Sequence, residues 1–269
     1  GVKGAALATV IARSVSMVVV VTVLSKREKL ITFRFGSFKA ITEIWRKVLY
    51  IAAPATLGLL ITPLSLAVIT RIVSAFGKEA MAAFGVASRV EMFGLMTVSS
   101  LSSVMIIFIG QNYSSHQYPR IQQALRYGRN FSLLWGGAFF LFLLLFAGTL
   151  AGIFTKDPQV IDIARKYFLI VGGSYGFQGL VMLSTSAYNG LNKPYPSMFF
   201  IAVRTFGLFV PLAWVGSKLI ELPGVMWAGF IANIIVGIAA FTYLQKTVTQ
   251  ISMSHTLQAS TSSTNATAQ

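Results

Sequence analysis

The sequence predicts an all-α polytopic membrane protein, a helical bundle whose members each cross the lipid bilayer. Hydrophobic residues make up 55% of the 269 residues, charged residues make up 11%, and the mean hydropathy is +0.72. Apolar stretches long enough to cross ~30 Å of hydrocarbon, which takes roughly 20 helical residues, recur along the chain. Because a spanning segment must satisfy its own backbone hydrogen bonds, these stretches are expected to be helices. The predicted spans are residues 4–24, 48–70, 81–111, 131–154, 167–188, 196–217 and 223–244.

The first span, residues 4–24, does not resemble a signal peptide, since it lacks a basic segment before it and a small-residue cleavage site after it. The chain also begins Gly-Val-Lys-Gly, without Met. We therefore expect the chain to be a fragment of a longer membrane protein.

A linker at residues 25–47 follows the first span. From residue 38 apolar side chains recur at helical spacing, and Lys39, Glu43 and Lys47 occupy the other face. This pattern predicts a short helix lying in the membrane interface before the chain enters the bilayer.

The second span contains two prolines, Pro54 and Pro63. Each removes a backbone donor and tends to kink a helix. Two interpretations remain open: a bend that lines a cavity or moves, as in the broken helices of transporters, and a fixed kink without a moving role.

Glu91 lies about ten residues into the third span, which is ~15 Å along a helix at 1.5 Å per residue. An ionisable group at that depth is costly and marks a candidate functional site. Arg89 lies on nearly the opposite helix face, so the two residues are not a local pair. Glu91 is therefore a candidate for ion coupling, and the alternative is a structural ion pair with Arg13, Arg71 or Arg204.

The fifth span is expected to begin with Asp157 as N-cap and Pro158 at the first helical position. Gly172, Gly176 and Gly179 then share one face, which favours close helix–helix packing over substrate contact. After residue 250 the composition turns to Ser, Thr, Ala, Gln and Asn, and residues 251–269 are expected to be a disordered tail.

The net charge of +15 is assigned to membrane topology and contact with anionic lipid rather than to nucleic acid. Basic residues are more numerous on the side of the 25–47 linker, so that linker and the C-terminal tail are expected in the cytoplasm. The basic residues on that side are Lys26, Arg27, Lys29, Arg34, Lys39, Arg46, Lys47, Arg120, Arg126, Arg129, Lys193 and Lys246. The opposite side holds Lys3, Arg71, Lys78, Lys156, Arg165, Lys166 and Lys218.

The chain lacks the residues of common catalytic and metal sites. It has no cysteine and two histidines, His116 in a loop and His255 in the tail. Phosphate-binding glycine loops, a Gly-x-Ser-x-Gly motif and paired carboxylates are also absent from the sequence. We therefore expect no enzyme, no metal and no cofactor.

An ordered series of short motifs resembles the multidrug and toxic compound extrusion (MATE) transporters, from the entry of their sixth helix to the connection between the tenth and eleventh. Ile109-Gly-Gln-Asn-Tyr113, at the end of a span and before a basic loop, is the most specific match. The other matching segments are residues 1–9, 51–54, 87–91, 154–158 and 187–194.

The resemblance implies twelve helices in two six-helix lobes. Residues 1–24 would be the last helix of the N-terminal lobe, 25–47 the cytoplasmic linker and 48–250 the C-terminal six-helix lobe. The remaining N-terminal lobe would be missing from this chain. Sodium-coupled members carry carboxylates in the seventh and tenth helices, and the corresponding positions here, by spacing from Pro54 and Gly190, are the neutral Thr62 and Gln178. Coupling by proton is therefore favoured over coupling by sodium.

The sequence thus predicts an antiporter in a bacterial inner membrane that exports amphiphilic or cationic drugs in exchange for protons. Alternatives are a lipid-linked oligosaccharide flippase, for which Arg13, Arg89 and Arg204 inside spans would be typical, and a non-transporting scaffold. Besides Glu91, the candidates to line a central cavity are Thr62, Tyr175, Gln178, Met182 and Asn189.

Overall fold

The computed structural model describes residues 2–27 and 38–267, and every element in these ranges is a helix. Besides the α-helices there are two π-helical segments, η1 and η3, and one 3₁₀ turn, η2. In chain order the elements are α1 Val2–Thr22, η1 Val23–Arg27, α2 Phe38–Ser74, α3 Lys78–Ser114, α4 Tyr118–Phe154, α5 Pro158–Val171, η2 Gly172–Ser174, α6 Tyr175–Gly190, α7 Pro194–Ala202, η3 Val203–Phe209, α8 Val210–Leu219 and α9 Glu221–Thr267.

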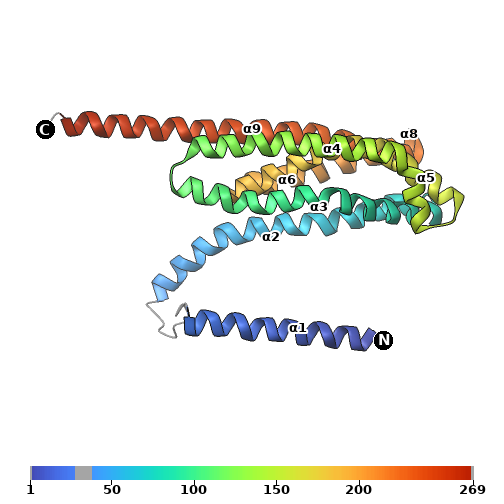
Figure 1. The fold of residues 1–269 in the computed structure, drawn as a ribbon, viewed down its shortest axis with the longest axis horizontal. Helices are drawn as coiled ribbons and strands as arrows, with labels where there is room; N and C mark the ends of the chain where they lie inside the picture. Colours follow the sequence, from blue (N-terminus) through green and yellow to red (C-terminus); the bar gives the residue numbers. More distant parts are fainter. Residues whose placement is uncertain (1, 28–37, 268–269) are drawn as a thin grey trace. The chain divides into compact units, whose positions relative to one another are not determined.

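The chain divides into two compact units, Gly1–Val48 and Leu49–Gln269. In the first unit α1 exposes apolar side chains along its length, among them Val10, Met17 and Val18. In the second unit α6 is the central helix and packs against α3, α4 and α9 (Figure 1).

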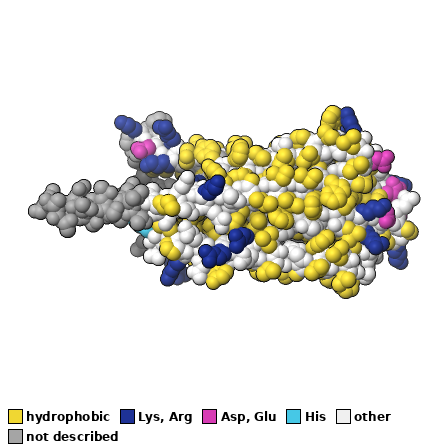
Figure 2. Space-filling model, turned by 90° about the horizontal axis from the view of Figure 1, so that it is seen from above, with side chains coloured by type: hydrophobic (Ala, Val, Ile, Leu, Met, Phe, Trp, Pro, Cys, Tyr) yellow, Lys and Arg dark blue, Asp and Glu magenta, His cyan; other side chains and the backbone are white. Residues whose placement is uncertain are grey.

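Helices of sufficient length and hydropathy to cross a membrane confirm the predicted membrane bundle. Within the described ranges there are seven, and they match the seven predicted spans in order. In the second unit the outward side chains are apolar, for example Leu134, Leu141 and Leu145 on α4. On the face drawn in Figure 2, hydrophobic side chains cover the middle of this unit, Lys and Arg gather toward its two ends, and Asp and Glu lie at one of these ends. Such an apolar surface is suited to contact with lipid rather than with water.

Glycines determine how closely α6 approaches its neighbours, as the packing interpretation predicts. A Cβ at Gly176 would meet the Leu133 backbone on α4, and a Cβ at Gly179 would meet the side chains of Ser132 and Val98. The Ser132 hydroxyl donates to the Gly176 carbonyl at 2.9 Å across this contact. Close backbone approach of this kind is typical of membrane helix pairs.

The start of the fifth span also agrees with its prediction. The Asp157 carboxylate accepts from the Gln159 backbone N–H at 2.9 Å, and Pro158 is the first residue of α5. The fifth and sixth spans are nevertheless composite: α5, η2 and α6 form one, and α7, η3 and α8 form the other.

The structure differs from two local predictions. The expected interfacial helix after residue 36 is not separate, because α2 runs from Phe38 through both Pro54 and Pro63 to Ser74. No Gly or Pro lies between residues 38 and 53 to end the helix. The expected disordered tail is instead the C-terminal part of α9, which continues to Thr267. Residues 251–267 also lack Gly and Pro, and the His255 ring stacks on His116 with centroids 4.2 Å apart.

Candidate functional site

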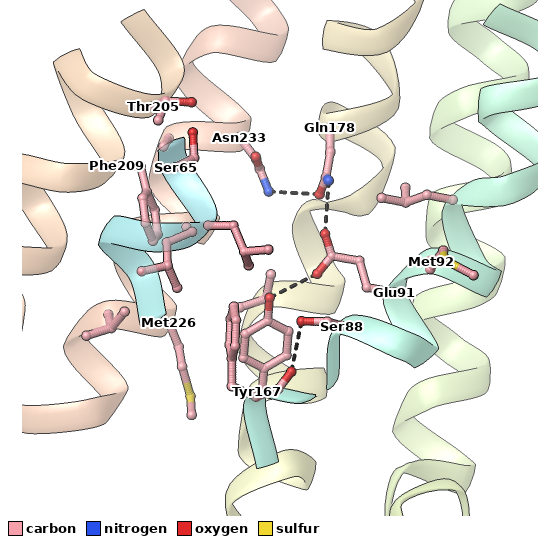
Figure 3. A pocket seen from close by; sticks show the side chains of 18 of the residues that line it. Ser65, Ser88, Glu91, Met92, Tyr167, Gln178, Thr205, Phe209, Met226 and Asn233 are labelled. Atoms are coloured by element: carbon pink, nitrogen blue, oxygen red, sulfur yellow. Dashed lines mark hydrogen bonds between the residues drawn. The ribbon is translucent and has the colours of Figure 1, made fainter. Parts of the chain in front are cut away.

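A cavity of about 790 Å³ lies inside the second unit (Figure 3). Its walls come from the C-terminal half of α2 and from α3, α5, α6, η3 and α9. Most of the lining is apolar, and the only charged residues among the lining side chains are Glu91 and Arg204. A cavity of this volume is within the range of ~300–1,000 Å³ typical of small-molecule sites.

Glu91 is held in the wall by two neutral donors. The Tyr167 hydroxyl donates to Glu91 Oε2 at 2.9 Å, and Gln178 Nε2 donates to Glu91 Oε1 at 3.0 Å. Figure 3 shows the carboxylate between these two side chains. In the described part of the chain the ion pairs join other residues, and none includes Glu91. The hypothesis of a direct structural ion pair with Arg71 or Arg204 therefore does not match this geometry, and Arg13 belongs to the other compact unit.

Two amides connect Glu91 to Arg204. Asn233 Nδ2 donates to Gln178 Oε1 at 3.2 Å and to Ser174 Oγ at 2.9 Å, and Arg204 Nη1 donates to Asn233 Oδ1 at 3.3 Å. An ionised carboxylate can only accept and a guanidinium can only donate. The two ends therefore fix the orientation of both amides: each presents its nitrogen toward Glu91 and its oxygen toward Arg204.

The helix geometry around this network is irregular. Arg204 lies in η3, the π-helical segment between α7 and α8, and Ser174 is the last residue of the 3₁₀ turn η2. π-helical segments inside α-helices occur frequently at functional sites, because the extra residue redirects side chains. Hydropathy alone does not reveal either irregularity.

The remaining wall consists of flexible and aromatic apolar side chains, among them Met92, Met96, Met226, Phe84 and Phe209. Methionine side chains adapt to irregular ligands and make favourable contacts with aromatic rings. Hydroxyl groups in the wall bond to their own helices: Ser88 Oγ donates to the Phe84 carbonyl at 2.8 Å, and Ser100 Oγ donates to the Met96 carbonyl at 3.0 Å.

Three of the predicted cavity residues, Glu91, Gln178 and Met182, line this cavity. Tyr175 does not, since it is 1% exposed and its ring packs 5.9 Å from that of Phe139 on α4. The Thr62 and Pro54 side chains lie outside the described part of the structure.

Asn189 also differs from its prediction. It is exposed near the C-terminal end of α6, and its backbone carbonyl accepts from the Asn192 N–H at 3.1 Å. It follows Gln178 by about 16 Å along the helix axis. It therefore lies beyond the cavity rather than in its wall.

Of the predicted intramembrane arginines in the second unit, Arg204 lines the cavity. Arg71 and Arg89 are exposed and belong to no cavity wall among the described residues. Arg89 faces away from Glu91, as the helical spacing predicts. Arg13 is exposed on α1 in the first unit.

Tyr167, Asn233 and Ser174 were not predicted. The sequence does contain a signal for Asn233, which is a polar residue in the middle of the last apolar span. Tyr167 stands at the start of a span, where aromatic residues are common for other reasons.

A bundle of membrane-spanning helices around a cavity with an intramembrane carboxylate and arginine is the architecture of a membrane transporter. Comparison with known proteins gives the family. The MatE family model matches residues 54–215, and the chain belongs to this family of transporters, which are not enzymes.

Curated relatives show the same family along most of the chain. An FAD transporter of Shewanella oneidensis is 32% identical over 245 residues, covering 91% of this chain and 54% of the relative. A probable multidrug resistance protein of Bacillus subtilis, YoeA, is 25% identical and is matched over 56% of its length. The chain thus spans about half the length of the curated relatives it matches.

Solved structures confirm the predicted fold. The MATE transporter VcmN of Vibrio cholerae in its bent form superposes with a TM-score of 0.81 at 29% identity, covering 92% of this chain and 56% of that one. An outward-facing MATE family transporter gives a TM-score of 0.81 at 21% identity and supports the fold alone.

Proposed function

We propose that this chain is the larger part of a secondary active antiporter that exports amphiphilic or cationic compounds in exchange for protons. The observation that carries the proposal is Glu91, a carboxylate in the wall of an intramembrane cavity that is held by neutral donors only. A direct arginine partner would hold such a carboxylate in its ionised form. Neutral donors add no formal positive charge that a bound proton would have to displace.

Protonation of Glu91 would alter the network in a defined way. A protonated carboxyl group has one O–H to donate, and the Tyr167 hydroxyl can rotate to accept it. The Gln178 amide would then lose a charged acceptor, and its contact with Asn233 would be free to change. Proton uptake in one state of the transporter and release in another would thereby couple to the shape of the cavity.

Protons are favoured over sodium because the amide of Gln178 replaces a carboxylate that the sodium-coupled pattern requires. Gln178 bonds to Glu91 and Asn233 and adds no second negative charge to the cavity.

The proposed transporter resides in a bacterial inner membrane, with its C-terminal segment in the cytoplasm. Alternating access needs two bodies that move against each other. Because the chain spans about half of its relatives, we propose that residues outside it supply the N-terminal lobe. Membrane lipid is expected to contact the apolar outer faces.

A flippase for lipid-linked oligosaccharides is less well supported. That function would need several basic residues facing the cavity, and Arg89 in the second unit is exposed and is not part of the described cavity wall. A non-transporting scaffold would have no need for a cavity of about 790 Å³ with a carboxylate in its wall.

The test is transport by the complete protein in proteoliposomes with an imposed pH gradient and ethidium as substrate. We expect gradient-driven export that is unchanged when sodium is replaced by potassium. Glu91→Gln is expected to reduce that export by about tenfold or more, because it removes the only proton-binding carboxylate of the cavity. Glu79→Gln is the matched control, since Glu79 lies at the start of the same helix and outside the cavity. A strong sodium requirement, or wild-type pH dependence in the Glu91 variant, would refute the proposal.

A further inference from the structure

Arg204 is the least compensated charge in the cavity. It follows Pro194 by ten residues, about 15 Å along the helical span, which places it deep in the apolar region. An arginine at such depth is costly and is retained where it pairs with another group or serves a substrate pathway.

The hydrogen bonding of Arg204 is incomplete within the described part of the chain. Its guanidinium carries five N–H donors, and the structure gives it one hydrogen bond, from Nη1 to the neutral Asn233 Oδ1 at 3.3 Å. This bond is long for a charged donor, since charge-assisted bonds are typically ~2.7–2.9 Å. Asn233 therefore orients Arg204 without neutralising it.

Within the described part of the chain, the carboxylate of the cavity forms no direct ion pair with Arg204. Both oxygens of Glu91 accept from Tyr167 and Gln178, and the described ion pairs do not include Arg204. Gln178 and Asn233 lie between the two charges and hold them apart. Arg204 lines the cavity, so its N–H groups without a described partner are available to a ligand there.

We infer that Arg204 binds the acidic group of a transported amphiphile, a phosphate or a carboxylate. The inference rests on the proposed transport function and narrows its substrate class. A guanidinium presents paired N–H groups that match the oxygens of either anion in a bidentate contact. The π-helical segment that contains Arg204 is a second sign of a functional position.

The other wall residues indicate the chemistry of the non-acidic part of the ligand. Phe209 is five residues from Arg204 in the same π-helical segment, and Met92, Met96 and Met226 provide an adaptable apolar surface. Such a wall suits a flat aromatic body. The predicted ligand class is therefore an aromatic amphiphile with one acidic group.

Flavin mononucleotide and riboflavin form a matched pair of probes, because they share one aromatic body and differ in the phosphate. Their intrinsic fluorescence reports binding to the purified complete transporter in nanodiscs of phosphatidylcholine. The wild-type protein is expected to bind flavin mononucleotide about tenfold more tightly than riboflavin, as for a hydrogen bond to a charged group.

Arg204→Gln is expected to abolish this preference, because it weakens the binding of flavin mononucleotide and leaves the binding of riboflavin unchanged. Arg204→Lys is expected to keep part of the preference. Arg89→Gln is the matched control, the same change at an exposed arginine outside the cavity. Equal affinities for the two flavins in the wild-type protein, no binding of flavin mononucleotide, or a preserved preference in Arg204→Gln would each overturn the inference.

The phosphate could come from a soluble compound or from a lipid headgroup. Repeating the measurement in nanodiscs that contain phosphatidylglycerol separates these sources. Retained binding of flavin mononucleotide supports a soluble ligand, and its loss through competition supports an anionic lipid at Arg204. The outcome is also separate from that of the transport assay: ethidium export without a phosphate preference refutes only the inference, and phosphate-selective binding without any export refutes the proposed function.

Discussion

Asn233 is the residue on which the polar network of the cavity depends. It is 7% exposed, and it donates to Gln178 and Ser174 while accepting from Arg204. Each of its polar atoms therefore has a partner, as buried amides require. Removal of this side chain would leave Gln178 Oε1 and the Arg204 guanidinium without the partners described here.

Asn233→Ala is expected to lower the free energy of unfolding by about 1–3 kcal/mol, the cost of leaving buried polar groups unsatisfied. Denaturation of the purified protein with sodium dodecyl sulfate, followed by tryptophan fluorescence, measures the change. Asn189→Ala is the control, because Asn189 is exposed at the end of α6. Equal unfolding midpoints for the two variants would show that the network adds no stability.

Glu91 and Asn233 illustrate what sequence can show about single residues. A carboxylate ten residues into an apolar span is costly enough to be conspicuous, and the structure places Glu91 in the cavity wall. A neutral amide costs less in the same setting and is common in helix interfaces. Asn233 and Tyr167 are therefore recognised only when the helices that bring them to Gln178 and Glu91 are in place.

At the scale of elements, the contact between α4 and α6 depends on a pair of facing glycines. A Cβ added to Gly136 would meet the backbone of Gly176 and of Tyr175. The neighbouring Gly137 has no atom of another element within 4 Å of the same position. Gly136 and Gly137 are therefore neighbours on the same helix that differ in whether another helix packs against them.

Gly136→Ala is expected to destabilise the protein by about 1–3 kcal/mol, because the two backbones must separate to admit the methyl group. Gly137→Ala is expected to be neutral or to stabilise the protein by up to about 1 kcal/mol, since Ala has the higher helix propensity. Thermal unfolding of both variants in one detergent measures the difference. A melting temperature for Gly136→Ala at or above that of Gly137→Ala would contradict the close packing.

The spans and their interruptions were not equally predictable. Hydropathy identifies the spans because the lipid imposes both length and composition on each helix. It does not identify η2 or η3, since hydropathy reports composition and not the backbone hydrogen-bonding pattern of Gly172–Ser174 or Val203–Phe209. The continuation of α9 to Thr267 was missed because a polar composition was interpreted as disorder, although no residue there ends a helix.

At the scale of the whole molecule, the described cavity is built by the second unit alone. Its walls run from Ser65 on α2 to Asn233 on α9, all within Leu49–Gln269. The described hydrogen-bond partners of Glu91 and Arg204 all belong to this unit. The change of access between the two sides of the membrane is the step for which we propose a second lobe.

The orientation of the bundle in the membrane can be measured with single cysteines, because this chain contains none. Ser115 lies in the turn between α3 and α4, Lys156 lies in the turn between α4 and α5, and both are exposed. The 37 residues of α4 measure about 55 Å, which exceeds the thickness of the hydrocarbon core. The two turns must therefore lie on opposite sides of the membrane if α4 spans it.

The positive-inside rule places the turn at Ser115 in the cytoplasm and the turn at Lys156 outside. In a complete transporter without other cysteines, a membrane-impermeant maleimide is expected to label Lys156→Cys in intact cells. Ser115→Cys is expected to react only after the membrane is permeabilised. The reverse pattern would overturn the orientation and keep the fold, whereas equal labelling in intact cells would show that α4 does not cross the membrane. Because both positions flank α4, a reversed orientation and a helix that does not cross the membrane give different labelling patterns.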